Sequence, residues 1–262
     1  MPVERRGGAP RAGMREGIME AVITREKHRR TAIAVGALFI VGDIAGVLSV
    51  LVTRGLLEGP DVLTRIAADQ GRLALGALLV LVMGFALAMV PVLMYPVFKK
   101  YNEVLALGTV VFRGALETAA YMATAGAWLL LLGLSREPAA AAAATGASPL
   151  EALGALLVSA QGSTTAYLTS IAFALGSVMF YALFYQSRLV PRWLSVWGLA
   201  GAVLYLAAPL LDMFGHGFGI LMAPLAVAEI VLAVWLIAKG LNAPSPDRAP
   251  APQRTVLGRM PA

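Results

Sequence analysis

Four ionisable side chains lie inside strongly apolar stretches of the sequence: Asp43, Arg113, Glu117 and Glu229. Each is near the middle of a run that has the length of about 20 residues needed to cross a bilayer. A charge at the bilayer centre costs about 2.5–3.5 kcal/mol on insertion scales, so such residues face a protein interior and have partners. Their presence at this depth indicates either an internal polar clamp that fixes helix packing or a binding site for a proton, a cation or a small ligand.

Arg113 and Glu117 are four residues apart, which places them on one face of a helix. We therefore expect an ion pair along this helix, with Tyr121 continuing the polar face. With Asp43 and Glu229 included, the site holds three carboxyl groups and one guanidinium group. Full ionisation would leave a formal charge of minus two in a low-dielectric setting. We therefore expect at least one of Asp43 and Glu229 to carry a proton near neutral pH.

The elements that must position these residues are transmembrane helices. The chain of 262 residues is 59% hydrophobic and 14% charged, against about 45–50% and about 25% for an ordinary soluble domain. Six windows are long and apolar enough to cross a bilayer. We predict an all-α polytopic membrane bundle with transmembrane helices at residues 31–53, 73–98, 105–134, 166–186, 194–213 and 218–238.

The distribution of Lys and Arg predicts the orientation, because basic residues in short loops stay on the cytoplasmic side. Outer loops hold only Arg54, Arg65, Arg72 and Arg136, and Arg113 lies inside the third span. The N- and C-termini are therefore expected in the cytoplasm of a multi-pass protein of the cell membrane. The other 16 of the 21 basic residues lie on that side: Arg5, Arg6, Arg11, Arg15, Arg25, Lys27, Arg29, Arg30, Lys99, Lys100, Arg188, Arg192, Lys239, Arg248, Arg254 and Arg259.

The cytoplasmic placement of the basic residues accounts for the net charge of +6, because these residues set the orientation and attract anionic headgroups. We therefore expect the lipid bilayer as a partner and no nucleic acid. We assign residues 1–30 to a partly disordered cytoplasmic segment, 31–242 to the transmembrane domain and 243–262 to a disordered cytoplasmic tail. Residues 14–30 can form a helix with an apolar side, which favours docking at the membrane surface before the first span. Nothing in the pattern indicates an oligomeric state.

Two outer loops are each expected to contain a short interfacial helix. Pro60 and Asp61 open the first, in which apolar residues 62, 63 and 66 share one side and the helix stops at Gly71. The spacing of Ser148, Pro149 and Glu151 predicts a capping box at the start of the second. One helix over residues 149–186 would be about 57 Å long at 1.5 Å per residue. We therefore favour a separate interfacial or re-entrant segment up to residue 160, over a tilted and projecting fourth span.

Several classes of chemistry are excluded by composition. The absence of Cys excludes thiolate metal sites and a cysteine nucleophile, and two His, at positions 28 and 216, exclude a three-histidine metal site. We expect no metal and no cofactor. Ser163 and His216 are expected at the outer face, but no further residue supports a hydrolase. Asp212 and His216 are four residues apart and could form a surface pair at a helix end.

Three segments resemble a prokaryotic membrane family known as domain of unknown function 4386. The run Tyr-Gln-Ser-Arg-Leu-Val-Pro-Arg-Trp-Leu-Ser-Val-Trp-Gly-Leu at 185–199 is similar to that family's fourth loop region. Residues 95–98 and 101–108 resemble its second cytoplasmic loop, with Phe112-Arg113 and Glu117 after it. Residues 228–240 are similar to its last helix. The resemblance covers about residues 31–242 and implies a six-span fold without an assigned reaction, and it includes Arg113 and Glu229 but not Asp43.

The leading functional hypothesis is a non-enzymatic membrane protein that uses a midplane polar site for transport or ligand sensing. The site residues are Arg113, Glu117, Glu229, Asp43 and Tyr121, and the candidate ligand is a small molecule, a proton or a cation. One alternative is a structural or partner-binding membrane subunit in which the buried charges only fix helix packing. Another is a membrane enzyme that acts on lipid.

Overall fold

The computed structural model describes residues 9–59, 61–137, 149–160, 162 and 166–242. Within these ranges the chain is helical with no strand, and six helices are long and apolar enough to span a membrane. The predicted all-α bundle of six transmembrane helices is therefore confirmed. The six are α1 (Ala9–Thr53), α3 (Gln70–Phe98), α4 (Glu103–Thr109) continued by η1 (Val110–Leu116) and α5 (Glu117–Leu134), α8 (Ala166–Ser187), α9 (Arg192–Met213), and η4 (Gly219–Met222) continued by α10 (Ala223–Ala238).

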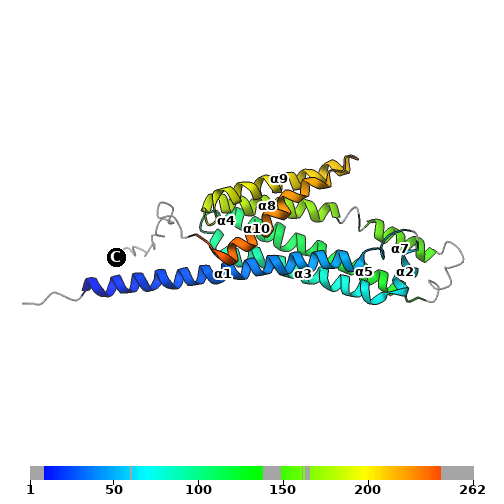
Figure 1. Cartoon of the computed structure of the whole chain (residues 1–262), viewed down its shortest axis with the longest axis horizontal. Coiled ribbons are helices and arrows are strands. Elements are labelled where there is room, and N and C mark those ends of the chain that lie inside the picture. The colour runs from blue at the N-terminus through cyan, green and yellow to red at the C-terminus, as the bar shows by residue number, and fades with distance from the viewer. Residues whose placement is uncertain (1–8, 60, 138–148, 161, 163–165, 243–262) are drawn as a thin grey trace, which may run out of the picture.

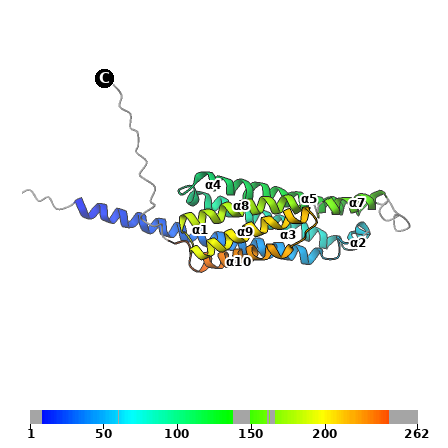
Figure 2. The same cartoon turned by 90° about the horizontal axis from the view of Figure 1, so that it is seen from above.

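The spans form an elongated bundle of roughly antiparallel helices (Figures 1 and 2). The end of α10 lies at the same end of the bundle where α1 enters it, as an even number of crossings requires. The distribution of Lys and Arg predicts this end to be cytoplasmic, and it is called the cytoplasmic end below. Two short helices, α2 (Val62–Ala68) and α7 (Pro149–Ala160), lie at the opposite, outer end.

Helix α1 continues far beyond the first span and projects from the cytoplasmic end (Figure 1). It begins at Ala9, inside the segment expected to be partly disordered. Residues 14–30 are helical as expected, but they run in line with the span instead of turning onto the membrane surface. The physical reason is local: no Gly or Pro occurs from Ile18 to Val35, so nothing breaks the helix before it enters the bilayer.

The outward faces of the spans are apolar, as lipid contact requires. Val50 of α1, Leu130 of α5 and Val234 of α10 are 66%, 62% and 54% exposed. Large aliphatic side chains exposed on every side of a helical bundle would be unfavourable in water, but they suit a hydrocarbon solvent. The exposed faces therefore agree with the composition in making this an integral membrane protein.

The outer helix α2 forms as predicted, but its apolar side faces the protein. Val62, Leu63 and Ile66 are at most 1% exposed and pack with Leu73 of α3 and Trp128 of α5. The helix ends at Ala68, and α3 already begins at Gln70, before the glycine expected to stop it. The side predicted to lie on lipid is thus buried against neighbouring helices.

Helix α7 also forms as predicted, and its Glu151 stabilises the start of α2. The Glu151 carboxylate accepts hydrogen bonds from the backbone N–H groups of Leu63 and Thr64 at 3.2 and 3.3 Å, and from Thr64 Oγ1 at 3.1 Å. These N–H groups are among the free donors of the first helical turn. The capping box expected within α7 involves Ser148, which is outside the described residues, and Glu151 serves the neighbouring helix.

Helices α7 and α8 are separate elements, which agrees with the favoured division of residues 149–186. α7 ends at Ala160 and α8 begins at Ala166. The residues expected to interrupt them, apart from Gly162, lie outside the described residues, as does the Ala tract at 139–144. The two outer helices α2 and α7 together cover the outer ends of α3 and α5.

The loop between α8 and α9, which is part of the run at 185–199 described above, holds the residues that follow α10. Asn242 donates from its backbone N–H to Leu189 O at 2.7 Å and from Nδ2 to Arg188 O at 3.0 Å. Arg188 has φ of 55°, a left-handed conformation that turns the chain after α8. Leu189 and Val190 are buried beside it. The loop thereby links α8, α9 and the residues after α10 at the cytoplasmic end.

Candidate functional site

Arg113 lies at the centre of the bundle and is fully buried. It belongs to the π-helix η1, whose backbone is closed by a bond from Glu117 N to Phe112 O. A π-helix adds one residue to the turn and is frequently found at functional sites. The neighbouring α8 comes very close here, because a Cβ on Gly176 would lie 2.8 Å from both the backbone N and Cβ of Arg113. Only a glycine allows this approach.

The guanidinium of Arg113 forms an ion pair with Glu229 of α10, with 2.6 Å between Nη2 and Oε1. At this distance the two charged groups are in direct contact. Nη1 donates to Ser177 Oγ of α8 at 2.9 Å. Arg113 therefore connects η1 with two other spans.

The expected ion pair between Arg113 and Glu117 is not formed, although both residues are fully buried in the same region. The prediction assumed the period of an α-helix, in which residues four apart share a face. The backbone between the two residues is π-helical, so the helical period on which the prediction rested does not apply there. Glu229, more than a hundred residues away in sequence, takes the place expected for Glu117.

Glu117 instead pairs with Tyr121, as the predicted polar face implied. Tyr121 donates from its hydroxyl to Glu117 Oε1 at 2.9 Å. The second oxygen, Oε2, is buried without a hydrogen-bond partner. Glu117 is thus a fully buried carboxyl group that accepts one hydrogen bond and has no cation in contact.

Asp43 of α1 is half-buried and is close enough to Glu229 and Arg113 to interact with both electrostatically. It has no hydrogen bond or ion pair with any other described residue. Gly42 and Gly46 beside it let α3 approach closely, since a Cβ at either position would meet Leu87 or Met83. Asp43 therefore lies at the edge of the site, not in direct contact with the guanidinium.

Three aromatic rings surround the guanidinium and were not predicted from the sequence. Arg113 Cζ is 5.1 Å from the ring centroid of Phe39, 4.8 Å from Phe173 and 5.4 Å from Phe180. Cation–π contacts in a desolvated setting are worth about 2 kcal/mol or more. The seven-residue spacing of Phe173 and Phe180, with Ser177 between them, was the available signal that they share one face of α8.

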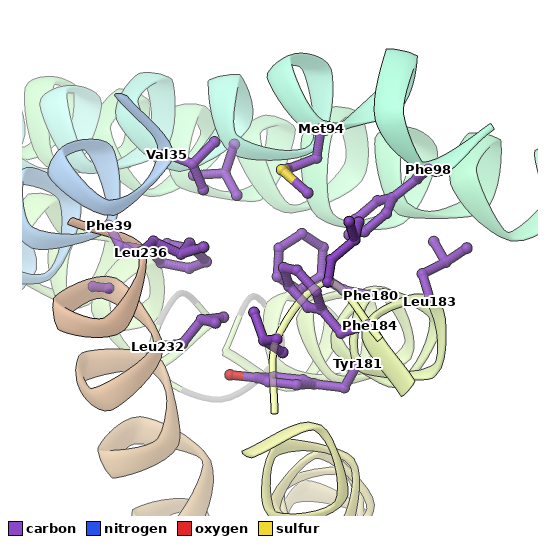
Figure 3. Close-up of a cluster of buried hydrophobic side chains, with 14 of the residues drawn as sticks. Val35, Phe39, Met94, Phe98, Phe180, Tyr181, Leu183, Phe184, Leu232 and Leu236 are labelled. Atoms are coloured by element: carbon purple, nitrogen blue, oxygen red, sulfur yellow. The ribbon is translucent and has the colours of Figure 1, made fainter. Parts of the chain in front are cut away.

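The cytoplasmic side of Arg113 is closed by an aromatic and aliphatic cluster. Phe98, Phe180 and Phe184 meet edge to face, with centroid distances of 5.4, 5.1 and 4.9 Å. Figure 3 shows these rings gathered between α3 and α8, with Leu232 and Leu236 of α10 facing them. We call the three Phe rings the aromatic plug. Tyr181 packs against Phe180 and Phe184, and its hydroxyl is buried without a hydrogen-bond partner among the described residues.

The balance of buried charges determines which chemistry the site can support. Arg113 neutralises one carboxylate, Glu229, and leaves the buried Glu117 without a countercharge. A buried isolated carboxylate is very costly, so Glu117 is stable only with a bound proton or with a cation beside it. The ionisable groups around it are Arg113, Glu229, Tyr121, Tyr205 and, farther away, Asp43 and Tyr181. Proton binding is the chemistry that this set of residues supports.

The residues considered for a metal site or a hydrolase are not brought together in the described part of the chain. In the part of the chain that the structure describes, no three His, Cys, Asp or Glu residues are grouped as metal ligands. Ser163 is outside the described residues. His216 is exposed and follows the end of α9, and Asp212 accepts a hydrogen bond from Tyr167 at 2.7 Å instead of pairing with it. Asp212 and His216 are both exposed at the outer end of α9, and no ion pair between them is found among the described residues.

Comparison with known proteins assigns the family. The family model described as Domain of unknown function (DUF4386) matches residues 34–240. This range includes the site residues and the loop that anchors the last span. No curated protein and no solved structure matches the chain. The earlier resemblance is thereby confirmed, and the chain belongs to the DUF4386 family, whose function is unknown.

Proposed function

We propose that this integral membrane protein of the cell membrane is a proton-linked transporter, and that Glu117 is the group that binds the proton. One observation carries the proposal: Glu117 is fully buried near the middle of the bundle, and the only guanidinium of the site pairs with Glu229 instead. Ionisable residues within membrane spans are typical of proton relays and ion pathways. Uptake of a proton removes the charge of Glu117, and its release restores the charge.

The fixed ion pair is needed for this role. Arg113 is enclosed by three rings and paired with Glu229, so its charge stays in place while Glu117 gains or loses a proton. The positive charge lowers the cost of the ionised state, and burial favours the neutral state. Because these two effects oppose each other, the Glu117 carboxyl group can both bind and release a proton. Tyr121 keeps its side chain oriented.

Glu117→Gln is expected to abolish acid-driven proton flux, because the amide has the shape of the carboxyl group but cannot release a proton. The measurement uses proteoliposomes with a trapped pH indicator and an imposed pH gradient. Glu103→Gln is the matched control, because Glu103 is exposed at the start of α4 and lies away from the site. We expect Glu103→Gln to retain wild-type flux.

Flux that is equal in wild type and Glu117→Gln would overturn this proposal. Such a result would favour a structural role, for which there is one specific observation: Arg113 of η1 contacts α8 and α10 at once. In that case the ion pair fixes helix packing and the carboxyl group of Glu117 is only a hydrogen-bond acceptor for Tyr121.

A further inference from the structure

Polar side chains follow Glu117 toward the outer end, whereas toward the cytoplasm Tyr181 of α8 is a buried polar group near Arg113 and Glu229. Tyr121 lies one turn outward on α5 and donates to Glu117. Tyr205 of α9 is close enough to Tyr121, Glu117 and Glu229 to interact electrostatically with each. On the cytoplasmic side of Arg113, Phe180 lies against the guanidinium and packs on Phe184 of the aromatic plug. The site is therefore asymmetric along the membrane normal.

Tyr205 connects the buried site with the next polar residue on α8. Its side chain is hydrogen-bonded to that of Ser170. Its ring packs edge to face on Phe173 with 4.8 Å between centroids, and Phe173 in turn lies 4.8 Å from Arg113 Cζ. Ser170 and Ser177 are seven residues apart, so one face of α8 presents a hydroxyl at both levels.

A cavity of about 290 Å³ begins at Ser170 and opens at the outer end of the bundle. It lies among α8, α9 and η4, and its polar groups are Tyr167, Ser170 and Asp212. Tyr167 donates to Asp212 Oδ2 at 2.7 Å, and Asp212 is exposed. A cavity of this size holds several water molecules, because one water occupies about 30 Å³ in the liquid. The cavity therefore reaches from solvent to Ser170, which is hydrogen-bonded to Tyr205.

We propose that this cavity is the outer port of the site, through which protons pass from the external solution by way of Ser170, Tyr205 and Tyr121 to Glu117. The inference rests on the proposed function of Glu117 and adds the route and the side of access. Each hydroxyl accepts one proton and releases another, so it is unchanged after the transfer. The last step forms one O–H bond on the Glu117 carboxylate. The aromatic plug closes the cytoplasmic side in this conformation.

The lack of Cys in the natural chain allows a direct test with single cysteines. Ser170→Cys is treated with the membrane-impermeant cation 2-(trimethylammonium)ethyl methanethiosulfonate, added outside oriented proteoliposomes. The thiolate displaces the sulfinate from the reagent and forms a mixed disulfide. Ser187→Cys is the control, because Ser187 is on the same helix but is buried at its cytoplasmic end, whereas Ser170 is half-buried.

We expect external reagent to modify Ser170→Cys at least about tenfold faster than Ser187→Cys, equivalent to a barrier lower by about 1.4 kcal/mol. Modification of Ser170→Cys should then reduce acid-driven proton flux by a similar factor, and a reductant that removes the adduct should restore it. Tyr205→Phe tests the route without a reagent, and should slow flux because it removes the hydroxyl while retaining the ring that packs on Phe173.

Three outcomes would count against the port. Ser170→Cys that does not react from outside would overturn it, and so would complete modification without a change in flux. Full flux in Tyr205→Phe would overturn the hydroxyl route. If Glu117→Gln abolishes flux in the same assay, these results leave the proposed function intact. If Glu117→Gln retains wild-type flux, both proposals fail.

Discussion

Arg113→Met is expected to destabilise the folded protein by about 3–5 kcal/mol, the range for removing one partner of a buried ion pair. The substitution leaves Glu229 94% buried and without a cation, so its carboxyl group either stays charged at high cost or takes up a proton. It also removes the hydrogen bond to Ser177 and the contacts with three aromatic rings. The free energy of unfolding in mixed micelles, with denaturing detergent as the titrant, measures this change.

The double variant Arg113→Met/Glu229→Gln should recover a large part of the loss, because no unpaired charge is left at this position. Arg54→Met is the control, since Arg54 is an exposed basic residue of an outer loop. It should change the unfolding free energy little. Equal stability of wild type and Arg113→Met would contradict the account of the ion pair. A double variant no more stable than Arg113→Met would show that Glu229 is not the residue left unpaired.

Gly176→Ala is expected to destabilise the bundle by about 1–3 kcal/mol, the usual cost of adding a methyl group to a tightly packed region. The new Cβ would lie 2.8 Å from the backbone N of Arg113 and 3.2 Å from its Cα. These atoms belong to the backbone of η1, so the clash cannot be relieved by a rotamer change. α8 must move away, and the contact between Arg113 and Ser177 should lengthen.

Gly126→Ala is the matched control, because a Cβ at Gly126 of α5 meets nothing within 4 Å. It should be neutral or slightly stabilising, since Ala is favoured over Gly in a helix interior. Thermal unfolding of both variants in lipid nanodiscs measures the difference. Equal melting temperatures for Gly176→Ala and Gly126→Ala would contradict the close approach of α8 to η1.

The fold could be predicted because its main determinant is local. Six long apolar windows are sufficient to identify the spans, and charged residues or Gly and Pro mark their ends. The straight continuation of α1 beyond its span and the burial of the apolar side of α2 could not be predicted. In both cases the sequence shows an amphipathic or apolar helix, but whether lipid, water or protein covers it depends on tertiary packing.

The buried charged residues could be identified from the sequence, but their contacts could not. Burial cost alone singles out Arg113, Glu117, Glu229 and Asp43. Which carboxylate pairs with Arg113 depends on the packing that brings Glu229 of α10 to the guanidinium, and no sequence signal identified the π-helix that contains Arg113. The aromatic enclosure was missed for a related reason: Phe residues are common in apolar spans, and only the packing of α1 and α8 brings Phe39, Phe173 and Phe180 together.

The most direct measurement of the central claim is infrared difference spectroscopy of the protein in nanodiscs between high and low pH. A proton on a buried carboxyl group gives a C=O stretching band that an ionised group lacks. Such a band should appear in wild type and in Glu103→Gln on acidification and be absent from Glu117→Gln, because Glu117 is the buried carboxyl without a cation. An unchanged band in Glu117→Gln would contradict the claim that Glu117 binds the proton.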